Sequence, residues 1–466
     1  MLTREADAFG GSCVAAPLRL LAVLLLAILS CSSACSSLPA GVEKRLAVFD
    51  AYTQELGENY PFFAQKQIDW PALTRAYRSA IWMSERPSDF YHLLAGMLAE
   101  LNDPHVSLSV PDECWSQGDA DFTSLYWLRG FRTFWVERSL HVESWPAGCA
   151  PTPPEHLPVE LASFPEITHV EGARTVVSMV DLVMRGEPGS EAELLLRWAD
   201  GTRTRHTLVR PPKEEAETIV VEIEGKDVVV DLTKLDGRSL DSALSLGQGR
   251  QLGWFRFDTF SPAKCNADAD AFSARADQLL DELREEGELP LVLDLRRNGG
   301  GKLAQMASFV GRFLTERVEL VQGLQEASYL FGLIQLRLFQ ALSLDPRGVR
   351  WDRPIYVLTS WRTASAAEIL ARILQRDCGA TLLGEQTIGA EALLASLDGD
   401  DGSTLTYGRT RQLDGRGVGI QDEGVTPDIA VRLRLEDVRR LGSYDAAKRD
   451  WQRRLERAIR RHQARH

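Results

Sequence analysis

The pattern of hydrophobic and polar residues changes twice along the chain and predicts three structural regions. From residue 41 to about residue 103, apolar positions recur at helical spacing, as in "VEKRLAVFDAYTQEL" and "PSDFYHLLAGMLAELND". Asp69 is placed to cap a further helix that enters at Pro71. We therefore expect an N-terminal helical domain over residues 41–108.

Short runs of alternating apolar and polar residues follow, which is the pattern of strands that are buried on one face. The segment "SEAELLLRWADGTRTRHTLVRPP" predicts a hairpin that turns at Ala199–Gly201. The segment "ETIVVEIEGKDVVVDL" predicts a second hairpin that turns at Glu224–Gly225. These patterns predict a β-rich region over residues 109–240.

From about residue 250, apolar strand patterns alternate with helical patterns. Strands are predicted in "LGWFRFDTF", "LPLVLDL", "PIYVLTS" and "ATLLGE", and helices in "DADAFSARADQLLDELREEG", "KLAQMASFVGRFL" and "SAAEILARILQRD". Such alternation implies crossover connections, so we expect an α/β domain with a mainly parallel sheet over residues 241–435. The apolar segment 325–346 is either a buried core helix or a cover over the cleft or a partner surface. Residues 436–466 predict a basic, solvated C-terminal helix.

The N-terminus has the pattern of an export signal over residues 1–35. Arg19 precedes the apolar run Leu20–Leu29, which suits a secretory signal and is too short to span a bilayer comfortably. Cys31 or Cys35 is placed for lipidation, the alternative being a plain cleaved signal with incidental cysteines. We therefore expect an exported protein of the periplasm or cell envelope with a lipid anchor.

Composition limits the remaining classes of function. The 466-residue chain has a net charge of −13, which argues against general nucleic-acid binding because that needs a basic surface. Neither CxxC nor HExxH spacing occurs, so a zinc site is not expected. In an oxidising compartment, Cys114 and Cys149 form the more plausible disulfide pair. The oligomeric state stays open.

Three polar segments follow the predicted parallel strands, at the sheet edge where such folds bind substrates. They are "DLRRNGGG", "SWRTASAAE" and "GEQTIGAE". Ser365 lies between a strand and a helix, and it is either a helix cap or a nucleophile. Gly299 and Gly300 either form a structural turn or present amide groups that, with the amide of Ala366, hold an oxyanion.

A serine nucleophile needs a general base, and a histidine is one candidate. His105 lies in "LNDPHVSL", where a helix ends and a strand begins, close to Asp103. Most other histidines lie in predicted loops, hairpins or the tail, where a solvated side chain is the ordinary case. His105 is therefore the candidate base.

Three motifs resemble the C-terminal processing (tail-specific) serine peptidases, a family that includes the tricorn core protease and the interphotoreceptor retinoid-binding proteins. They are "VLDLRRNGGG", "VLTSWRTASAAEIL" and "VGIQDEGVTPDIAV", and their order and spacing match over about residues 250–432. The N-terminal segments "YPFFAQKQIDW" and "LNDPHVSL" resemble the tricorn-like branch. The resemblance implies a crotonase-like α/β fold and, within residues 109–240, a degenerate PDZ-like domain.

The resemblance also implies roles for individual residues. It makes Ser365 the nucleophile, but Ala390 stands where the processing peptidases carry a lysine base, which excludes a Ser–Lys dyad there. His105 matches the histidine of the "LxDxH" motif in the tricorn-like branch, and Glu423 matches the glutamate before "GVxPD". Asp103 or Asp422 is the alternative acid, and Pro104 has no side chain that could relay a hydrogen bond.

The expected function is therefore an exported serine endopeptidase that cleaves a polypeptide substrate through an acyl-enzyme. The expected site comprises Ser365, His105 and an acid, with an oxyanion hole from Gly299, Gly300 and Ala366. The mechanism needs no metal or organic cofactor. The alternatives are a non-catalytic peptide- or ligand-binding protein on the same scaffold, favoured by Ala390 and Pro104, and another acyl hydrolase.

Overall fold

The computed structural model describes most of the chain between residues 40 and 465. The described ranges are 40–84, 87–110, 123–125, 128–157, 161–170, 173–211, 218–223, 226–231, 244–249, 252–260, 269–285, 289–329, 334–414 and 419–465. The predicted export signal, including Cys31 and Cys35, and the predicted turn Glu224–Gly225 lie outside them. No helix within these ranges is long and apolar enough to cross a membrane.

The N-terminal helices form as predicted. They are α2 (Ala40–Asn59), α3 (Trp70–Trp82) and α4 (Pro87–Ala99). The Asp69 carboxylate caps α3 by accepting a hydrogen bond from the amide of Ala72. Buried aromatic side chains such as Phe49 and Phe90 join the helices to a core that continues into the β-rich region.

The β-rich region has a six-stranded sheet in the order β3-β4-β5-β8-β9, with β6 paired to β5. Its elements are β1 (Ser107–Ser109), β2 (Thr123–Ser124), β3 (Arg132–Val136), β4 (Ser139–Ser144), β5 (Glu166–Val170), β6 (Ala173–Arg174), α6 (Val180–Val183), β7 (Arg185–Gly186), β8 (Glu191–Arg197), β9 (Arg203–Val209), β10 (Thr218–Ile223) and β11 (Lys226–Asp231). The two predicted hairpins are confirmed, because β8 pairs with β9 and β10 pairs with β11, both antiparallel.

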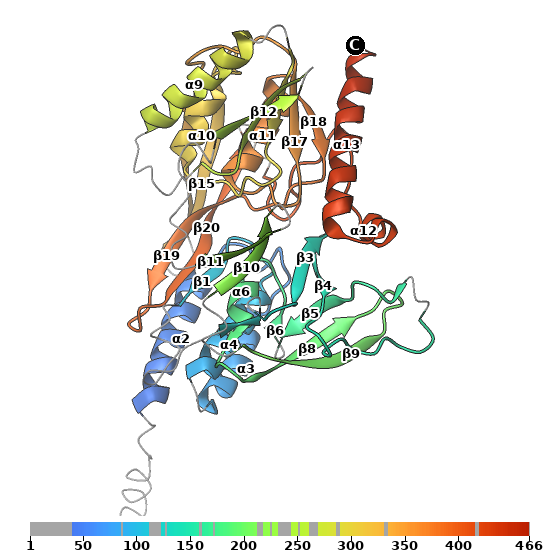
Figure 1. The fold of residues 1–466 in the computed structure, drawn as a ribbon. Helices are drawn as coiled ribbons and strands as arrows, with labels where there is room; N and C mark the ends of the chain where they lie inside the picture. Colours follow the sequence, from blue (N-terminus) through green and yellow to red (C-terminus); the bar gives the residue numbers. More distant parts are fainter. Residues whose placement is uncertain are drawn as a thin grey trace, which may run out of the picture.

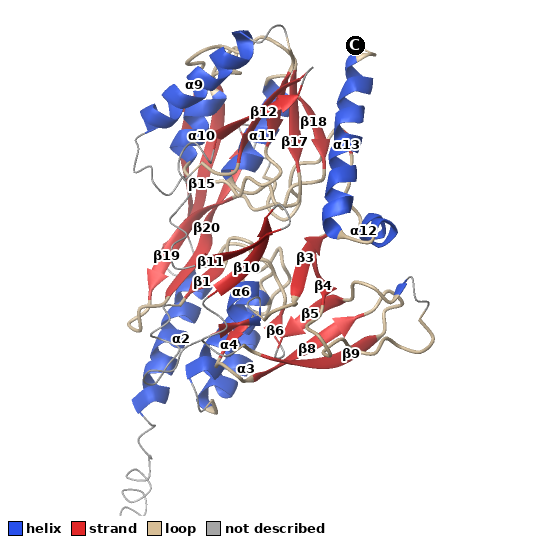
Figure 2. Cartoon of the chain, in the orientation of Figure 1, coloured by secondary structure: helices blue, strands red, loops and turns tan. Residues whose placement is uncertain are grey.

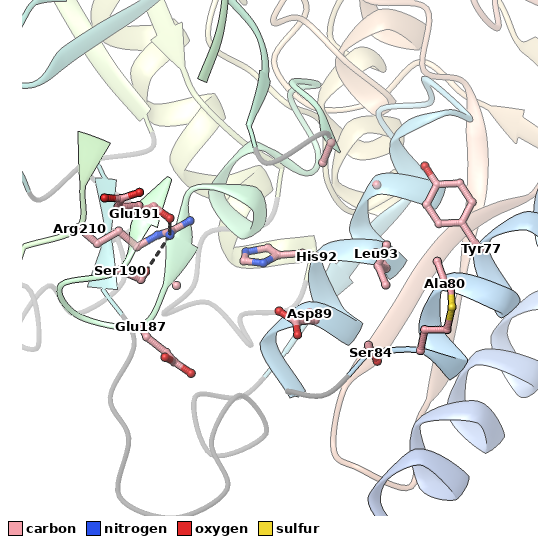
Figure 3. Close-up of a pocket in the computed structure, with 14 residues that line it drawn as sticks. Tyr77, Ala80, Ser84, Asp89, His92, Leu93, Glu187, Ser190, Glu191 and Arg210 are labelled. Atoms are coloured by element: carbon pink, nitrogen blue, oxygen red, sulfur yellow. Dashed lines mark hydrogen bonds between the residues drawn. The ribbon is translucent and has the colours of Figure 1, made fainter. Parts of the chain in front are cut away.

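A cavity of about 620 Å³ lies where the helical segment meets this region (Figure 3). The guanidinium of Arg210, which is 1% exposed, donates to Ser190 Oγ and to the carbonyl of Met184. Across the cavity, His92 of α4 is hydrogen-bonded to the carbonyl of Arg185. These contacts join the two segments into one packed unit. The predicted division into domains 41–108 and 109–240 stays a prediction.

The predicted α/β part contains a six-stranded sheet in the order β12-β13-β14-β17-β18-β21. The strands from β13 to β21 run parallel, and β12 is an antiparallel edge (Figure 2). The elements are β12 (Leu244–Gly249), β13 (Leu252–Phe257), α9 (Ala269–Glu285), β14 (Leu291–Asp294), α10 (Leu303–Val310), β17 (Ile355–Thr359), α11 (Ala366–Asp377), β18 (Thr381–Gly384) and β21 (Ile429–Ala430). The mixed α/β class and the parallel sheet are therefore confirmed.

Helices cover both faces of this sheet. Leu291 and Leu293 of β14 pack with α9, α10 and α11, while the intervening Val292 packs with α13 (Tyr444–Gln463). The period of two along β14 explains why that strand is apolar throughout. In Figure 1, α13 runs beside β17 and β18, and α12 (Leu435–Leu441) lies at the lower end of α13.

The basic C-terminal helix is confirmed, but it is not simply solvated. Ala447, Trp451, Leu455 and Ile459, four residues apart, are buried against the parallel sheet. This spacing places them on one face of α13, and the arginines lie mostly on its other faces. The helix is therefore part of the core.

Of the alternatives for residues 325–346, the buried core helix is wrong, while the cover over the cleft and the partner surface stay predictions. The described residues of this segment belong mainly to β15 (Val318–Tyr329) and β16 (Ile334–Leu344), which pair antiparallel and join β19 (Ala392–Asp398) and β20 (Thr404–Asp414) in a second sheet. The run "IQLRL" has the period of two typical of a strand. In the same sheet β1 pairs with β20, which brings the segment after His105 to the C-terminal half of the chain.

Candidate active site

The predicted glycine turn and the predicted nucleophile lie against one another. Gly300 has a φ of +94°, and a Cβ added to it would come within 2.7 Å of the Cβ of Ser365. The side chain of Asn298 fixes this turn, because its Oδ1 accepts from the amide of Gly300 and its Nδ2 donates to the carbonyl of Phe257. Only glycine therefore fits at position 300.

The hydrogen bond between Gly300 and Asn298 changes which amides are expected to form the oxyanion hole. The amide of Gly300 already donates to Asn298, at 2.9 Å. The amides of Gly299 and Ala366 have no hydrogen-bond acceptor in the described part of the chain. The geometry therefore favours these two amides over that of Gly300 as donors to a ligand.

Ser365 has a strained backbone at the turn between β17 and α11. Its φ of 55° and ψ of −127° are unusual for any residue with a side chain. Its amide donates to the carbonyl of Ala390 at 2.9 Å and to Glu368 Oε2 at 3.0 Å. The serine is therefore held from two sides, and its side chain is half-buried.

Glu368 contacts the candidate nucleophile, and sequence reasoning assigned it no role. Its fully buried carboxyl accepts hydrogen bonds from the hydroxyl of Thr387 and from the amides of Gly389, Ala390 and Ser365. Burial raises the pKa of Glu368 to about 7, and the four donors oppose that shift. The Ser-x-x-Glu spacing of a capping box was the sequence signal. The residue ties Ser365 to the loop that follows β18.

His105 is buried, with 8% of its surface exposed, and in the described part of the chain neither ring nitrogen has a hydrogen-bond partner. Burial lowers the pKa of His105, against the smaller opposing effect of the Asp103 carboxylate. Asp103 accepts hydrogen bonds from the amide of His105 and from the hydroxyl of Tyr60, so it holds the loop rather than the ring.

The second sheet brings His105 and Ser365 to the same region. A Cβ added to Gly408 of β20 would lie 3.7 Å from the Cβ of His105 and 2.6 Å from that of Ala392. Two residues before Ala392, the carbonyl of Ala390 accepts from the amide of Ser365. The start of β19 thus lies between the two candidate residues, and no hydrogen bond joins them in this structure.

Neither Glu423 nor Asp422 is hydrogen-bonded to the imidazole. Glu423 is exposed: its backbone amide donates to the carbonyl of Ile420, and its backbone carbonyl accepts from the side chain of Gln386. Asp422 forms an ion pair with Lys66 at 2.6 Å. The roles of Glu423 and Asp422 stay predictions.

Gln421, which sequence reasoning missed, faces the histidine loop instead. Its Nε2 lies 3.4 Å from Asp103 Oδ2, and its Oε1 accepts from the amide of Glu391. The Glu391 carboxylate is itself buried and accepts from the amide of Ile420. Spacing along the chain gave no signal for this contact, because residues 103 and 421 meet only in the folded protein.

Two cysteines remain to be placed. Cys149 is an exposed free thiol, so the predicted pair with Cys114 is not formed in this structure, and Cys114 itself lies outside the described residues. Cys378 is a half-buried free thiol at the end of α11, and burial raises its pKa to about 12. Neither thiol contributes to the candidate site.

Sequence comparison identifies the part of the chain that carries this site. Residues 251–431 match the sequence profile of peptidase family S41. This segment belongs to peptidase family S41. The S41 segment includes Ser365, Gly300, Glu368 and Glu423 but not His105. The predicted family resemblance is therefore confirmed over this segment.

Curated proteins with sequences similar to this chain include C-terminal processing peptidases. The chain is 29% identical over 280 residues to the chloroplastic C-terminal processing peptidase of Tetradesmus obliquus, covering 57% of this chain and 53% of that one. It is 25% identical to the carboxy-terminal processing protease CtpA of Bacillus subtilis, covering 57% and 50%. The chain thus spans about half the length of these two relatives. A carboxyl-terminal-processing protease of Picosynechococcus is 23% identical over 82% of this chain and 80% of its own length.

Solved structures support the fold of this chain. Mature CPAF in complex with lactacystin matches with a TM-score of 0.58 at 13% sequence identity, covering 90% of this chain and 98% of that chain. A second crystal structure of mature CPAF matches with a TM-score of 0.55, also at 13% identity, covering 88% and 96%. At this identity the likeness shows a shared fold, which extends beyond the S41 segment into the N-terminal regions.

Proposed function

We propose that this protein is an exported serine endopeptidase that hydrolyses peptide bonds through an acyl-enzyme, with Ser365 as nucleophile and His105 as general base. The observation that carries the proposal is the strained backbone of Ser365. This residue lies at the start of α11 and is in contact with Gly300. Strain of this kind persists where the surrounding structure enforces it, and it is concentrated at functional sites. The S41 match over residues 251–431 supports the same reaction class.

In the proposed reaction, the imidazole of His105 takes the hydroxyl proton of Ser365 while Ser365 Oγ bonds to the substrate carbonyl carbon. The carbonyl electron pair moves to oxygen, and the amides of Gly299 and Ala366 stabilise that oxyanion. The imidazolium then gives its proton to the leaving amine as the C–N bond breaks. A water molecule, deprotonated by the same imidazole, releases the acyl group from Ser365.

Two features of His105 bear on this reaction. Burial lowers the pKa of His105 and so favours the neutral ring, which is the form that accepts a proton. Because its ring nitrogens have no partner in the described part of the chain, the ring and the Ser365 hydroxyl must approach to about 2.6–3.2 Å when substrate binds. Catalytic hydrogen bonds are often long in ligand-free enzymes and tighten with substrate.

A non-catalytic peptide- or ligand-binding protein on the same scaffold is the second candidate. Ala390, in place of a lysine base, and the unbonded ring of His105 are the observations that favour it. A fluorophosphonate probe distinguishes the two candidates, because it modifies only an activated serine. We expect the wild-type protein to be labelled and Ser365→Ala and His105→Ala to lose the label.

The matched control is Ser396→Ala, which removes an exposed hydroxyl from β19 and should leave labelling unchanged. Folding of each variant is checked by circular dichroism. If the folded wild-type protein takes no label and cleaves no denatured protein, the binding function replaces the peptidase function. Labelling that survives Ser365→Ala would assign the nucleophile to another residue.

We also propose that the protein is lipid-anchored through Cys31 or Cys35 and that the β-rich region, residues 109–240, is a degenerate PDZ-like domain that presents the polypeptide substrate. The apolar run Leu20–Leu29 supports export. Incorporation of labelled palmitate that is lost in the Cys31→Ala or the Cys35→Ala variant tests the anchor. Wild-type protein that takes up no labelled palmitate and stays outside the membrane fraction would contradict the lipid anchor.

A further inference from the structure

A second cavity, of about 460 Å³, lies at the carboxyl edge of the parallel sheet, against the first half of α13. Arg256, Asp294, Ser360 and Glu385 line it from the ends of β13, β14, β17 and β18, and Lys448, Arg449 and Trp451 line it from α13. Open parallel sheets bind ligands at this edge. None of these residues belongs to the catalytic group described above.

The charge of this cavity is opposite to that of the whole chain. Six cationic side chains and three carboxylates line it, although the chain has a net charge of −13. The cationic residues are Arg256, Arg296, Arg297, Arg362, Lys448 and Arg449, and the acidic residues are Asp294, Glu385 and Asp445. A cavity with this balance attracts an anion.

The carboxylates leave part of that positive charge uncompensated. Asp294 is bound by Arg296 and Asp445 by Lys448, each at 2.6 Å. Glu385 is buried, which raises its pKa and disfavours its charged form. In the described part of the chain, Arg362 and Arg449 have no ion-pair partner, so they carry the positive excess.

Aromatic rings orient two of the guanidinium groups. Arg362 lies over the ring of Trp361 at 4.9 Å, and Arg296 lies over the ring of Trp451 at 5.0 Å. The N–H edge of Arg296 is already bound to Asp294, whereas Arg362 has no ion-pair partner in the described part of the chain. A guanidinium edge matches the two oxygens of a carboxylate, so Arg362 favours a planar anion over a cation or an apolar group.

The cavity lies close to the candidate nucleophile. Arg362 lies three positions before Ser365 in the chain, so their Cα atoms are at most about 11 Å apart. Trp361 also lines the cavity of about 880 Å³ that Asp103, Pro104 and Ile388 form beside His105. An extended polypeptide bound at Ser365 can therefore reach Arg362 within about three or four residues.

We propose that this cavity binds a carboxylate of the substrate polypeptide, at a fixed position a few residues from the scissile bond, through Arg362 and Arg449. The inference rests on the proposed peptidase function, since it names a substrate feature for that site. The carboxylate is either a glutamate or aspartate side chain or the C-terminal carboxylate of the substrate. Both present the same planar anion, so the experiment separates them.

Binding to the full-length Ser365→Ala protein tests the proposal without requiring catalysis. The probes are fluorescent decapeptides with blocked termini, neutral except for a single glutamate that is moved along the sequence. One further neutral decapeptide carries a free C-terminal carboxylate. We expect one of two results at low salt. Either the peptide with glutamate at one position binds about tenfold tighter than the matching glutamine peptide, or the peptide with a free C-terminal carboxylate binds about tenfold tighter than the matching amide peptide.

Arg362→Gln and Arg449→Gln should each remove most of that preference. Arg460→Gln, an exposed residue of α13 outside this cavity, removes the same charge and should keep it. The proposal fails if glutamate and glutamine peptides bind equally in every register, or if both cavity variants keep the preference. It also fails if inorganic phosphate displaces the peptides at equal concentration, which would indicate a site for small free anions.

These outcomes are independent of the test of the proposed function. A wild-type protein that takes the fluorophosphonate label but shows no charge preference retains its peptidase function and loses this inference. A protein that takes no label but binds the glutamate peptides through Arg362 loses the peptidase function, and the cavity then serves carboxylate recognition by a binding protein.

Discussion

The amide of Ser365 donates a hydrogen bond to the carbonyl of Ala390, at 2.9 Å. The candidate nucleophile therefore touches the residue that stands where related processing peptidases are expected to carry a lysine. Ala390 is only 1% exposed, so its methyl group faces protein rather than solvent. A longer side chain at position 390 would therefore start next to Ser365, whereas the methyl group of Ala390 cannot accept a proton.

The first prediction tests this relationship by combining Ala390→Lys with His105→Ala. A buried lysine has a lowered pKa and so can act as a general base. We expect fluorophosphonate labelling to recover at least about tenfold over His105→Ala, with a loss of stability of about 1–3 kcal/mol from overpacking. Ala390→Met in the same background adds similar bulk without an amine and should give no recovery. Equal recovery with methionine would contradict the idea.

The second prediction concerns the turn against Ser365. In Gly300→Ala the new methyl group would meet the Cβ of Ser365 at 2.7 Å, at a backbone φ of +94°. We expect the displaced serine to reduce kcat by more than about 10²-fold, as misplacements near 1 Å do. The control is Gly201→Ala, where φ is +88° and no atom lies within 4 Å. It carries the same backbone strain, so it should lose stability and keep activity.

Local patterns were enough to predict the elements around Ser365. The apolar run 355–358 predicted the strand β17, and helical spacing of apolar residues predicted the helix α11. Asp69 correctly predicted the start of α3. In each case the signal lies within a few residues of the element. The core helix, one alternative for residues 325–346, is wrong because high apolar content does not distinguish a helix from a strand, whereas the period of two in "IQLRL" is that of a strand.

The site itself was only partly predictable, because its contacts join distant residues. The sequence indicated Ser365, Gly300 and His105, but it could not show that the amide of Gly300 is already bound by Asn298. The contact between Tyr60 and Asp103 spans 43 residues, and that between Asp103 and Gln421 spans 318. Such partners depend on the packing of the helical segment against β19 and β20, for which a single sequence gives no local signal.

The third prediction is the acid limb of the pH profile. Because burial lowers the pKa of His105 below its usual 6.5, the neutral base persists at more acidic pH than for a solvated histidine. We expect kcat/KM to fall only below pH 6.5 as the ring becomes protonated. Asp103→Asn removes the carboxylate that raises this pKa and should move the inflection to still lower pH. An inflection at or above 6.5 in the wild type would exclude His105 as the titrating base.

The last prediction concerns Glu368, whose carboxyl accepts four hydrogen bonds in a fully buried position. Burial raises its pKa from 4.5 to about 7, so the folded protein holds this proton more tightly than the unfolded chain does. Stability from this group is therefore complete below about pH 4.5 and is lost as the pH rises toward 7. The slope is at most about 1.4 kcal/mol per pH unit.

Glu368→Gln removes this titration, and it leaves some of the four donors without an acceptor because an amide nitrogen cannot accept. We expect the variant to be destabilised by about 1–3 kcal/mol at low pH and by less near pH 8, in urea unfolding measured at both values. Glu58→Gln, an exposed carboxylate of α2, is the control and should show neither effect. His105 titrates with the opposite sign below pH 6.5, so only the difference between wild type and variant reports on Glu368. A pH-independent difference would contradict the prediction, because it would show that folding does not shift the pKa of Glu368.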